Sequence, residues 1–560
     1  MAGIPSDLIL THRVREKRFH KERKDCMGYL LGIDVGSTNL KAVLFGTDGR
    51  MVAKHEVPTE CFHPDPAHPD WAVWQPAQIW TGIAQSVRAV VASLAGGEIL
   101  GVAVTGMGMD GVPINRDGQW LYPFISWHCP RTAPQQAWWL ANIGADEQFA
   151  QGGNQVWTFN TALRLRWMQE HEPDILKKTH KWLLIEDFVN FMLCGETVTD
   201  YSMASTTLLF DQRTRRWNDD LLRRAGIDRS LLCDPLPAGT QIGRVHQAAA
   251  EATGLKQGTP VVLGGHDYCC GCLPTGAFEP GVLLDVLGTW EMVVSALHEP
   301  VLTPEVQRMG VLVDSHVARD RYAVMGATVA ADMLEWFKRE IGVPREVGPM
   351  AGGCLVNGGV TSRGVPTSAG EEATSEWARL IALALHSPIG SNGVFFLPHM
   401  SGSFCPVLDP ASVGAFVGLR NLASRGDLFR AVIEGLNYQF LEIVRAFERG
   451  LGVRNDRIVA IGGPTKNRLW MQGKADVTGL VVEVPDMEEA VPLGAALLAG
   501  IGTGVYRNER DAFSQVYRPG TSYVPDAEAQ ASYRELYARY AALYPTLKTY
   551  YGSNRSALRG

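Results

Sequence analysis

The stretch Val262–Val293 reads VLGGHDYCCGCLPTGAFEPGVLLDVLGTWEMV. Its apolar start predicts a strand, followed by a glycine-rich turn that holds Asp267, a short connection, and a second strand that ends at Gly288 and Thr289. A carboxylate can accept a proton from an alcohol, and a Gly-Thr turn can offer backbone N–H groups to a phosphate. The order of these two features suits phosphoryl transfer, in which Asp267 could accept the proton.

The composition predicts an ordinary globular protein of two or three domains. The chain has 560 residues, of which 46% are hydrophobic and 20% charged, and one core rarely serves so long a chain. The net charge of −7 provides no basic field for nucleic acid. Every apolar run is shorter than the roughly 20 residues of a membrane helix. The ten scattered cysteines fit reduced thiols, which predicts a cytoplasmic location.

Two short segments are not expected to take part in catalysis. Residues 1–26 are basic and lack an apolar segment, so they are not a secretory signal. We expect them to lie outside the fold, which would begin at Met27; a flexible arm that binds an acidic surface is the alternative. Cys269, Cys270 and Cys272 resemble half of a zinc site, but no second ligand pair follows. We therefore expect them to be small core residues.

The segment YLLGIDVGSTNLKAVLF, Tyr29–Phe45, predicts a hairpin around a polar turn. Asp34 ends the first strand, where a carboxylate can hold Mg²⁺ directly or through water. The glycine of the turn allows close approach to a ligand, and the hydroxyls and cation around it suit an anion: Gly36, Ser37, Thr38 and Lys41. An ordinary hairpin turn remains the alternative. The segment is not a Walker loop.

A second glycine turn lies in ILGVAVTGMGMDGVPI, Ile99–Ile114, and contains Gly108 and Asp110. A carboxylate there suits a polyol, because it accepts hydrogen bonds from two hydroxyls. The alternative is an aspartate that bonds to its own turn. Trp127 and Arg131 follow in SWHCPRT and are candidates for the same pocket, although Arg131 is equally well explained by a surface ion pair.

The chain contains a weak internal repeat. GIDVGSTNLKAV and LDVLGTWEMVV are both an apolar strand, an aspartate and a Gly-Thr turn that leads to another strand. This repeat predicts two related domains, each of which contributes one hairpin to a shared nucleotide. In the second half, IVAIGGPTK predicts a strand that runs into Gly462 and Gly463 before a helix that starts near Asn467. A helix N-terminus of this kind suits a nucleotide.

Five motifs in order resemble the FGGY family of sugar kinases, within the actin/hexokinase superfamily. LLGIDVGSTNLKAVLF and LGTWEM resemble its two phosphate motifs, GGHDYCCGC its catalytic turn, FLPHMSGSFCPVLDPASVGAFVGL its signature and GGPTKN its adenosine motif. The resemblance covers about residues 27–544. It implies an α/β fold of two ribonuclease-H-like domains with an interdomain cleft: a sugar-binding domain at 27–275 and an ATP-binding domain at 276–548, followed by a frayed tail at 549–560.

The resemblance also implies ATP and Mg²⁺ as cofactors and a role for each candidate residue. Asp267 would be the catalytic base and Asp34 the metal ligand. The phosphates and adenosine would contact Gly36, Ser37, Thr38, Lys41, Gly288, Thr289, Gly462, Gly463 and Asn467. The sugar would contact Gly108, Asp110, Trp127, Arg131, His266 and Asp267. For His266, orienting Asp267 or simple packing is the alternative.

Within the family, TGMGMDG, GHD, GTWE and SWHCPRT resemble the L-fuculokinases. The expected substrate is therefore a ketose such as L-fuculose, phosphorylated at C1; a pentulose kinase of the xylulose or ribulose type and a non-catalytic sugar-binding sensor are the alternatives. Two positions depart from the family: Ser403-Phe404 stands where Glu-Arg is usual, and Pro464 where a third glycine is usual. Relatives are often dimers, so the resemblance suggests a homodimer. Neither nucleic acid nor a membrane is an expected partner.

Overall fold

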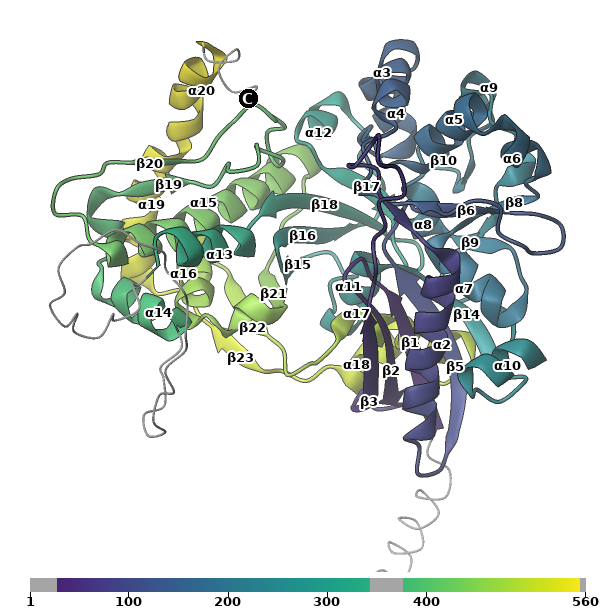
Figure 1. Ribbon diagram of the computed structural model, residues 1–560. Helices are drawn as coiled ribbons and strands as arrows, with labels where there is room; N and C mark the ends of the chain where they lie inside the picture. The colour runs from purple at the N-terminus through teal and green to yellow at the C-terminus, as the bar shows by residue number, and fades with distance from the viewer. Residues whose placement is uncertain (1–27, 343–375, 554–560) are drawn as a thin grey trace, which may run out of the picture.

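The computed structural model describes residues 28–342 and 376–553 (Figure 1). The predicted N-terminal extension lies outside the described residues. Two α/β halves stand side by side, each built on one large mixed sheet. No helix within the described ranges is long and apolar enough to span a membrane.

The first large sheet has the strand order β13-β14-β5-β1-β2-β3. Its strands are β1 (Gly28–Val35), β2 (Asn39–Gly46), β3 (Met51–Pro58), β5 (Glu98–Gly106), β13 (Gln241–Arg244) and β14 (Pro260–His266). β1, β2 and β3 form an antiparallel meander, while β5 runs parallel to β1 and β14 runs parallel to β5. The hairpin predicted around Gly36 is therefore confirmed.

The second large sheet has the order β17-β18-β16-β15-β21-β22-β23. Its strands are β15 (Val282–Leu287), β16 (Trp290–Leu297), β17 (Leu312–Ser315), β18 (Tyr322–Val329), β21 (Arg457–Ile461), β22 (Val481–Val484) and β23 (Thr521–Tyr523). β15 and β16 form an antiparallel hairpin, β18 pairs antiparallel with β16, and β21 runs parallel to β15. The second sheet differs from the first by an extra edge strand, β17, which precedes β18 in the chain and pairs with it. This shared topology confirms the internal repeat predicted from the two Gly-Thr hairpins.

The remaining elements cover these sheets or form a layer beside the first one. In the first half they are α2 (Pro76–Ala92), α3 (Ala133–Asn142), α4 (Ala145–Gly152), α5 (Thr161–His171), α6 (Pro173–Lys178), α7 (Ile185–Cys194), α8 (Tyr201–Ser205), α9 (Asp219–Ala225) and α10 (Gln247–Thr253), with the short strands β4 (Val73–Trp74), β6 (Gly111–Ile114), β7 (Phe124–Ile125), β8 (Lys181–Leu184), β9 (Val198–Asp200), β10 (Phe210–Asp211), β11 (Arg216–Trp217) and β12 (Asp234–Leu236). In the second half they are α12 (Pro304–Arg308), α13 (Ala331–Glu340), α14 (Glu376–His386), β19 (Phe395–Leu397), β20 (Ala415–Val417), α15 (Arg425–Leu451), α16 (Arg468–Thr478), α18 (Glu509–Val516), α19 (Ala527–Ala541) and α20 (Leu543–Ser553).

Two helices, α11 (Asp267–Thr275) and α17 (Ala490–Gly502), pack against each other where the halves meet (Figure 1). A Cβ added at Gly494 would lie 1.9 Å from the carbonyl oxygen of Cys270, so glycine is required for the two helices to approach so closely. Their shared core also takes in Leu30 from the first sheet and Leu284 from the second. The site at the start of α11 is therefore held by both halves.

The short connection predicted after Asp267 is wrong, because α11 occupies it. The helix is buried along most of its length, so it shows no alternation of polar and apolar faces that would indicate a helix. Its small residues Cys270 and Gly271 allow α17 to pack closely.

Candidate active site

Asp267 begins α11 directly after a sharp change of direction at the end of β14. Gly265 has a φ of 158°, and a Cβ there would lie 2.3 Å from the Val317 side chain and 2.7 Å from Ser202 Oγ. Any side chain at this position would push β14 away from both neighbours. The glycine turn that the sequence indicates is therefore what aims Asp267 at the junction of the two halves.

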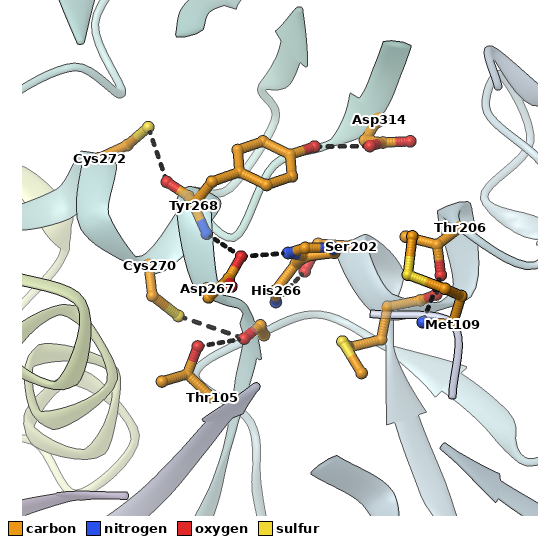
Figure 2. A network of polar contacts seen from close by, with 12 residues as sticks. Thr105, Met109, Ser202, Thr206, His266, Asp267, Tyr268, Cys270, Cys272 and Asp314 are labelled. Atoms are coloured by element: carbon orange, nitrogen blue, oxygen red, sulfur yellow. Dashed lines mark hydrogen bonds and ion pairs between the residues drawn. The ribbon is translucent and has the colours of Figure 1, made fainter. Parts of the chain in front are cut away.

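The two carboxylate oxygens of Asp267 have different surroundings (Figure 2). Oδ1 accepts a hydrogen bond from the Tyr268 backbone N–H at 2.6 Å and lies 2.7 Å from His266 Nδ1. Oδ2 receives no hydrogen bond from the part of the chain that the structure describes, and the side chain is 34% exposed. One oxygen is thus held in place while the other is free to take a proton.

His266 is held by its backbone as well as by its ring. Its N–H donates to Ser202 Oγ at 2.8 Å, and that hydroxyl donates to Asp200. Burial alone would lower the pKa of His266, but the carboxylates of Asp267, Asp314 and Asp200 outweigh it and raise the pKa. With a proton on Nδ1, the imidazole donates a hydrogen bond to Asp267 Oδ1.

Gly108, a predicted sugar residue, lies against the His266 ring. A Cβ at Gly108 would be 2.5 Å from His266 Nε2 and 3.0 Å from Thr206 Cγ2. The backbone of the next residue, Met109, donates to Thr206 Oγ1 at 3.2 Å. The structure thus brings Gly108, His266 and Asp267 together, and glycine at 108 leaves the room that the ring needs.

Gly108→Ala is expected to lower kcat by about 10- to 100-fold, because the new methyl group would displace the His266 ring from Asp267. Steady-state kinetics would measure this loss. Gly106→Ala is the matched control, since a Cβ at Gly106 would meet its neighbours at an ordinary 3.4 Å. Equal kcat values in the two variants would contradict the role given to Gly108.

The residue after Asp267 links α11 to the second half of the molecule. The Tyr268 hydroxyl donates to Asp314 Oδ2 at 2.5 Å (Figure 2). Asn154 Nδ2 donates to Asp314 Oδ1 at 2.6 Å. Asp314 belongs to β17, the edge strand of the second sheet. Its carboxylate therefore joins elements from both halves next to the candidate base.

Asp110, a predicted sugar residue, is fully buried. Its Oδ1 lies 2.8 Å from Arg164 Nη2, and its Oδ2 accepts from Trp74 Nε1 at 2.6 Å and from the Trp127 backbone at 3.2 Å. Burial raises the pKa of Asp110, although Arg164 opposes the shift. Asp110 therefore holds the wall of this region together, and direct sugar contact stays a prediction.

Trp127 and Arg131 lie on the same side of the first half. Trp127 is half-buried and stacks on His128, with ring centroids 3.8 Å apart. Arg131 is buried, with its guanidinium over Trp71 at 4.4 Å and over Trp167 at 5.0 Å. The surface ion pair that the sequence left open for Arg131 is wrong, because aromatic rings surround the cation instead.

Asp34 lies at the end of β1, where burial raises its pKa to about 7; Lys41 opposes the shift, and the nearby carboxylates of Asp267 and Glu489 add to it. Lys41 forms an ion pair with Glu489 at 3.2 Å. Glu489, which also contacts Lys54 at 2.7 Å, has a φ of 53° at the start of α17. The sequence reasoning missed Glu489, and no motif marks it.

The two predicted phosphate turns are both tied down by backbone hydrogen bonds. In the first turn, Gly36 N–H donates to the Asn39 carbonyl at 3.1 Å, and Ser37 and Thr38 remain partly or fully exposed. In the second turn, the Gly288 and Thr289 carbonyls accept from the first backbone N–H groups of the α13 region at 3.2 and 3.0 Å. Backbone hydrogen bonds thus hold both turns in place, and their hydroxyl and backbone groups face solvent.

The predicted adenosine turn lies beside the second phosphate turn. Gly462 has a φ of 107°, and a Cβ there would be 2.1 Å from the carbonyl oxygen of Leu287, the residue before Gly288. Gly463 faces open space. Asn467 caps α16 by accepting the Trp470 N–H at 3.3 Å.

Cys269, Cys270 and Cys272 are buried free thiols, and burial raises the pKa of each. Within the described ranges, no group of three or more His, Cys, Asp or Glu side chains is arranged to hold a metal ion. The expectation that these cysteines are core residues is confirmed.

Comparison with known proteins agrees with this geometry. Residues 29–273 match the N-terminal domain of the FGGY family of carbohydrate kinases, and residues 283–503 match its C-terminal domain. The chain belongs to the FGGY family of carbohydrate kinases. It is therefore a sugar kinase, and kinases of this family use ATP.

The relatives of this sugar kinase are named for several different substrates. It is 29% identical over 505 residues to an L-fuculokinase of Escherichia coli (strain K12), covering 90% of this chain and 98% of the relative. It is 28% identical over 530 residues to a xylulose kinase of Bacillus subtilis (strain 168), covering 93% and 98%. An autoinducer-2 kinase of Yersinia enterocolitica is 28% identical over 535 residues, covering 92% and 94%.

Solved structures confirm the fold of two α/β halves. The xylulose kinase from Rhodospirillum rubrum superposes with a TM-score of 0.81 at 27% identity, covering 94% of this chain and 100% of that chain. A gluconate kinase from Lactobacillus acidophilus gives a TM-score of 0.82 at 19% identity, covering 94% and 99%, which bears on the fold alone.

Proposed function

We propose that this kinase transfers the γ-phosphate of ATP to the C1 hydroxyl of a ketose such as L-fuculose, with Asp267 as the general base. The proposal rests on one observation: the two oxygens of the Asp267 carboxylate have different surroundings. His266 and the Tyr268 N–H hold Oδ1, which leaves Oδ2 at the junction of the two halves. The sugar hydroxyl would lie within hydrogen-bond reach of Oδ2.

In the proposed step the hydroxyl oxygen forms a bond to the γ-phosphorus, and the bond from that phosphorus to the β–γ bridging oxygen breaks. The hydroxyl proton moves to Asp267 Oδ2 and ADP leaves. The transition state is loose, so the proton can leave late, and positioning provides most of the acceleration. Gly108, Asp110, Trp127, Arg131 and His266 are the proposed sugar contacts.

The proposed nucleotide contacts come from three turns. They are Gly36, Ser37, Thr38 and Lys41 of the first hairpin, Gly288 and Thr289 of the second, and Gly462, Gly463 and Asn467 beside them. Asp34 suits Mg²⁺, a cation that prefers carboxylate oxygen, and its pKa of about 7 reflects burial together with nearby negative charge that a divalent cation would relieve. Bound Mg²⁺ would neutralise charge on the phosphates.

Measuring ADP release with a panel of sugars would test the proposal. We expect the highest kcat/KM for L-fuculose or L-rhamnulose, with phosphorus NMR placing the phosphate on C1. A preference for D-xylulose or L-ribulose would favour the pentulose alternative, which the similarity to xylulose kinases supports. Autoinducer-2 completes the panel because of the related kinases of that name. Turnover of autoinducer-2 alone, or of none of these compounds, would contradict the proposal.

A further inference from the structure

A fully buried cluster of charge lies in the second half, outside the proposed sugar site. The Lys474 ammonium contacts both the Asp285 and the Glu291 carboxylates, and all three side chains are 0% exposed. Lys474 Nζ also lies 4.0 Å from the centre of the Phe440 ring. We call these three residues the Lys474 triad.

The triad joins the elements that carry the two neighbouring nucleotide turns. Asp285 is on β15 and Glu291 on β16, and their strand pairing puts both side chains on one face of the hairpin that ends in Gly288-Thr289. Lys474 is on α16, the helix that follows the adenosine turn. Lys474 thus connects the hairpin of one turn to the helix of the other.

A second contact between the same turns is closely packed. Gly462 packs against the carbonyl oxygen of Leu287, at a distance that excludes even a methyl group. A shift of α16 relative to β15 would therefore change the spacing between Gly462 and Gly288. Small errors of placement in such a site cost much of the rate or affinity.

The two acids and the Lys474 ammonium affect one another's ionisation, because all three are buried in contact. Burial raises the pKa of Glu291 and that of Asp285, and Lys474 opposes both shifts. Burial alone would lower the pKa of Lys474, but the two carboxylates raise it. Without these two acids the Lys474 ammonium would be an uncompensated buried charge, which is strongly destabilising.

We propose that Lys474 is a positioning residue that, through Asp285 and Glu291, sets the spacing of the second phosphate turn and the adenosine turn and so controls nucleotide affinity. This inference rests on the proposed placement of ATP. It gives Glu291, which the sequence suggested only as a mark of the sugar, a role on the nucleotide side. The proposal therefore predicts that changes in the triad affect ATP binding and leave sugar binding nearly unchanged.

The test uses the whole enzyme and measures Tm, the Kd for ADP by calorimetry, and KM for ATP and for the sugar. Lys474→Met is expected to weaken ADP binding and raise KM for ATP about tenfold or more, with KM for the sugar within about twofold. Arg430→Met is the matched control: it removes a buried cation paired with Glu434 within α15 and should lower Tm without changing KM for ATP.

A triple variant keeps the test decisive if Lys474→Met folds poorly. Asp285→Leu, Glu291→Met and Lys474→Met together replace the triad by apolar side chains, which often restores stability. We expect Tm to recover while KM for ATP stays high. The inference would be overturned if the triple variant recovered both Tm and KM for ATP. It would also be overturned if Lys474→Met lowered Tm without raising KM for ATP. If the wild type binds ADP but phosphorylates no ketose, only the proposed sugar specificity fails.

Discussion

Asp267→Asn is expected to lower kcat by about 10²- to 10⁴-fold, the usual contribution of a positioned base. The asparagine oxygen can occupy the place of Oδ1 and accept from the Tyr268 N–H and from His266, so the start of α11 should keep its geometry. The amide nitrogen would replace Oδ2 and cannot take up a proton. The loss should therefore fall on kcat, with KM for ATP little changed.

Single-turnover and steady-state kinetics would measure this effect, with ADP binding and Tm as checks that the fold is intact. Asp174→Asn, which removes an exposed carboxylate from α6, is the control and should leave kcat unchanged. An Asp267→Asn enzyme that retains kcat within about tenfold of wild type would show that Asp267 is not the base.

The parts of the fold that could be predicted from the sequence are those with local signals. The hairpin around Gly36 shows as two β-rich runs separated by a polar glycine turn, and register across β1 and β2 places Asp34 opposite Lys41. The Gly-Thr hairpin at Gly288 repeats the pattern, and in both sheets the hairpin pairs with an antiparallel strand on one side and a parallel strand on the other. Such short-range patterns depend on few neighbours, so they can be recognised without a structure.

The remaining features depend on partners that are distant in the sequence. Lys41 and Glu489 are 448 positions apart, and their ion pair forms only because α17 packs on the first sheet. Lys474 and Asp285 are 189 positions apart. The helix α11 was missed for a related reason, since burial on all sides removes the polar face that indicates a helix.

Asp110 shows where a correct motif left the role of its residue open. The glycine turn suggested a carboxylate facing a polyol, yet the structure places both oxygens on Trp74, Trp127 and Arg164. The signal for this lies in Arg164, an arginine on the buried side of α5. A buried cation of this kind requires a buried partner, but the sequence does not say which acid provides it.

Asp110→Asn is expected to lower the free energy of unfolding by about 3–5 kcal/mol, because it leaves the Arg164 guanidinium buried without a counter-charge. Both side chains are at most 1% exposed, so solvent cannot take the place of the lost carboxylate. For domains of this size the expected fall in Tm is on the order of 10 °C. Calorimetry and urea unfolding would measure it.

The double variant Asp110→Asn/Arg164→Met separates the two roles of Asp110. Removing the guanidinium as well should restore most of the stability, since no uncompensated charge remains. If Asp110 also holds sugar hydroxyls, KM for the sugar stays high in the double variant while Tm recovers. If Asp110 acts only through Arg164, Tm and KM for the sugar both return toward the wild-type values. A single variant with unchanged Tm would contradict the ion-pair interpretation, because a buried arginine cannot lose its counter-charge without a cost in stability.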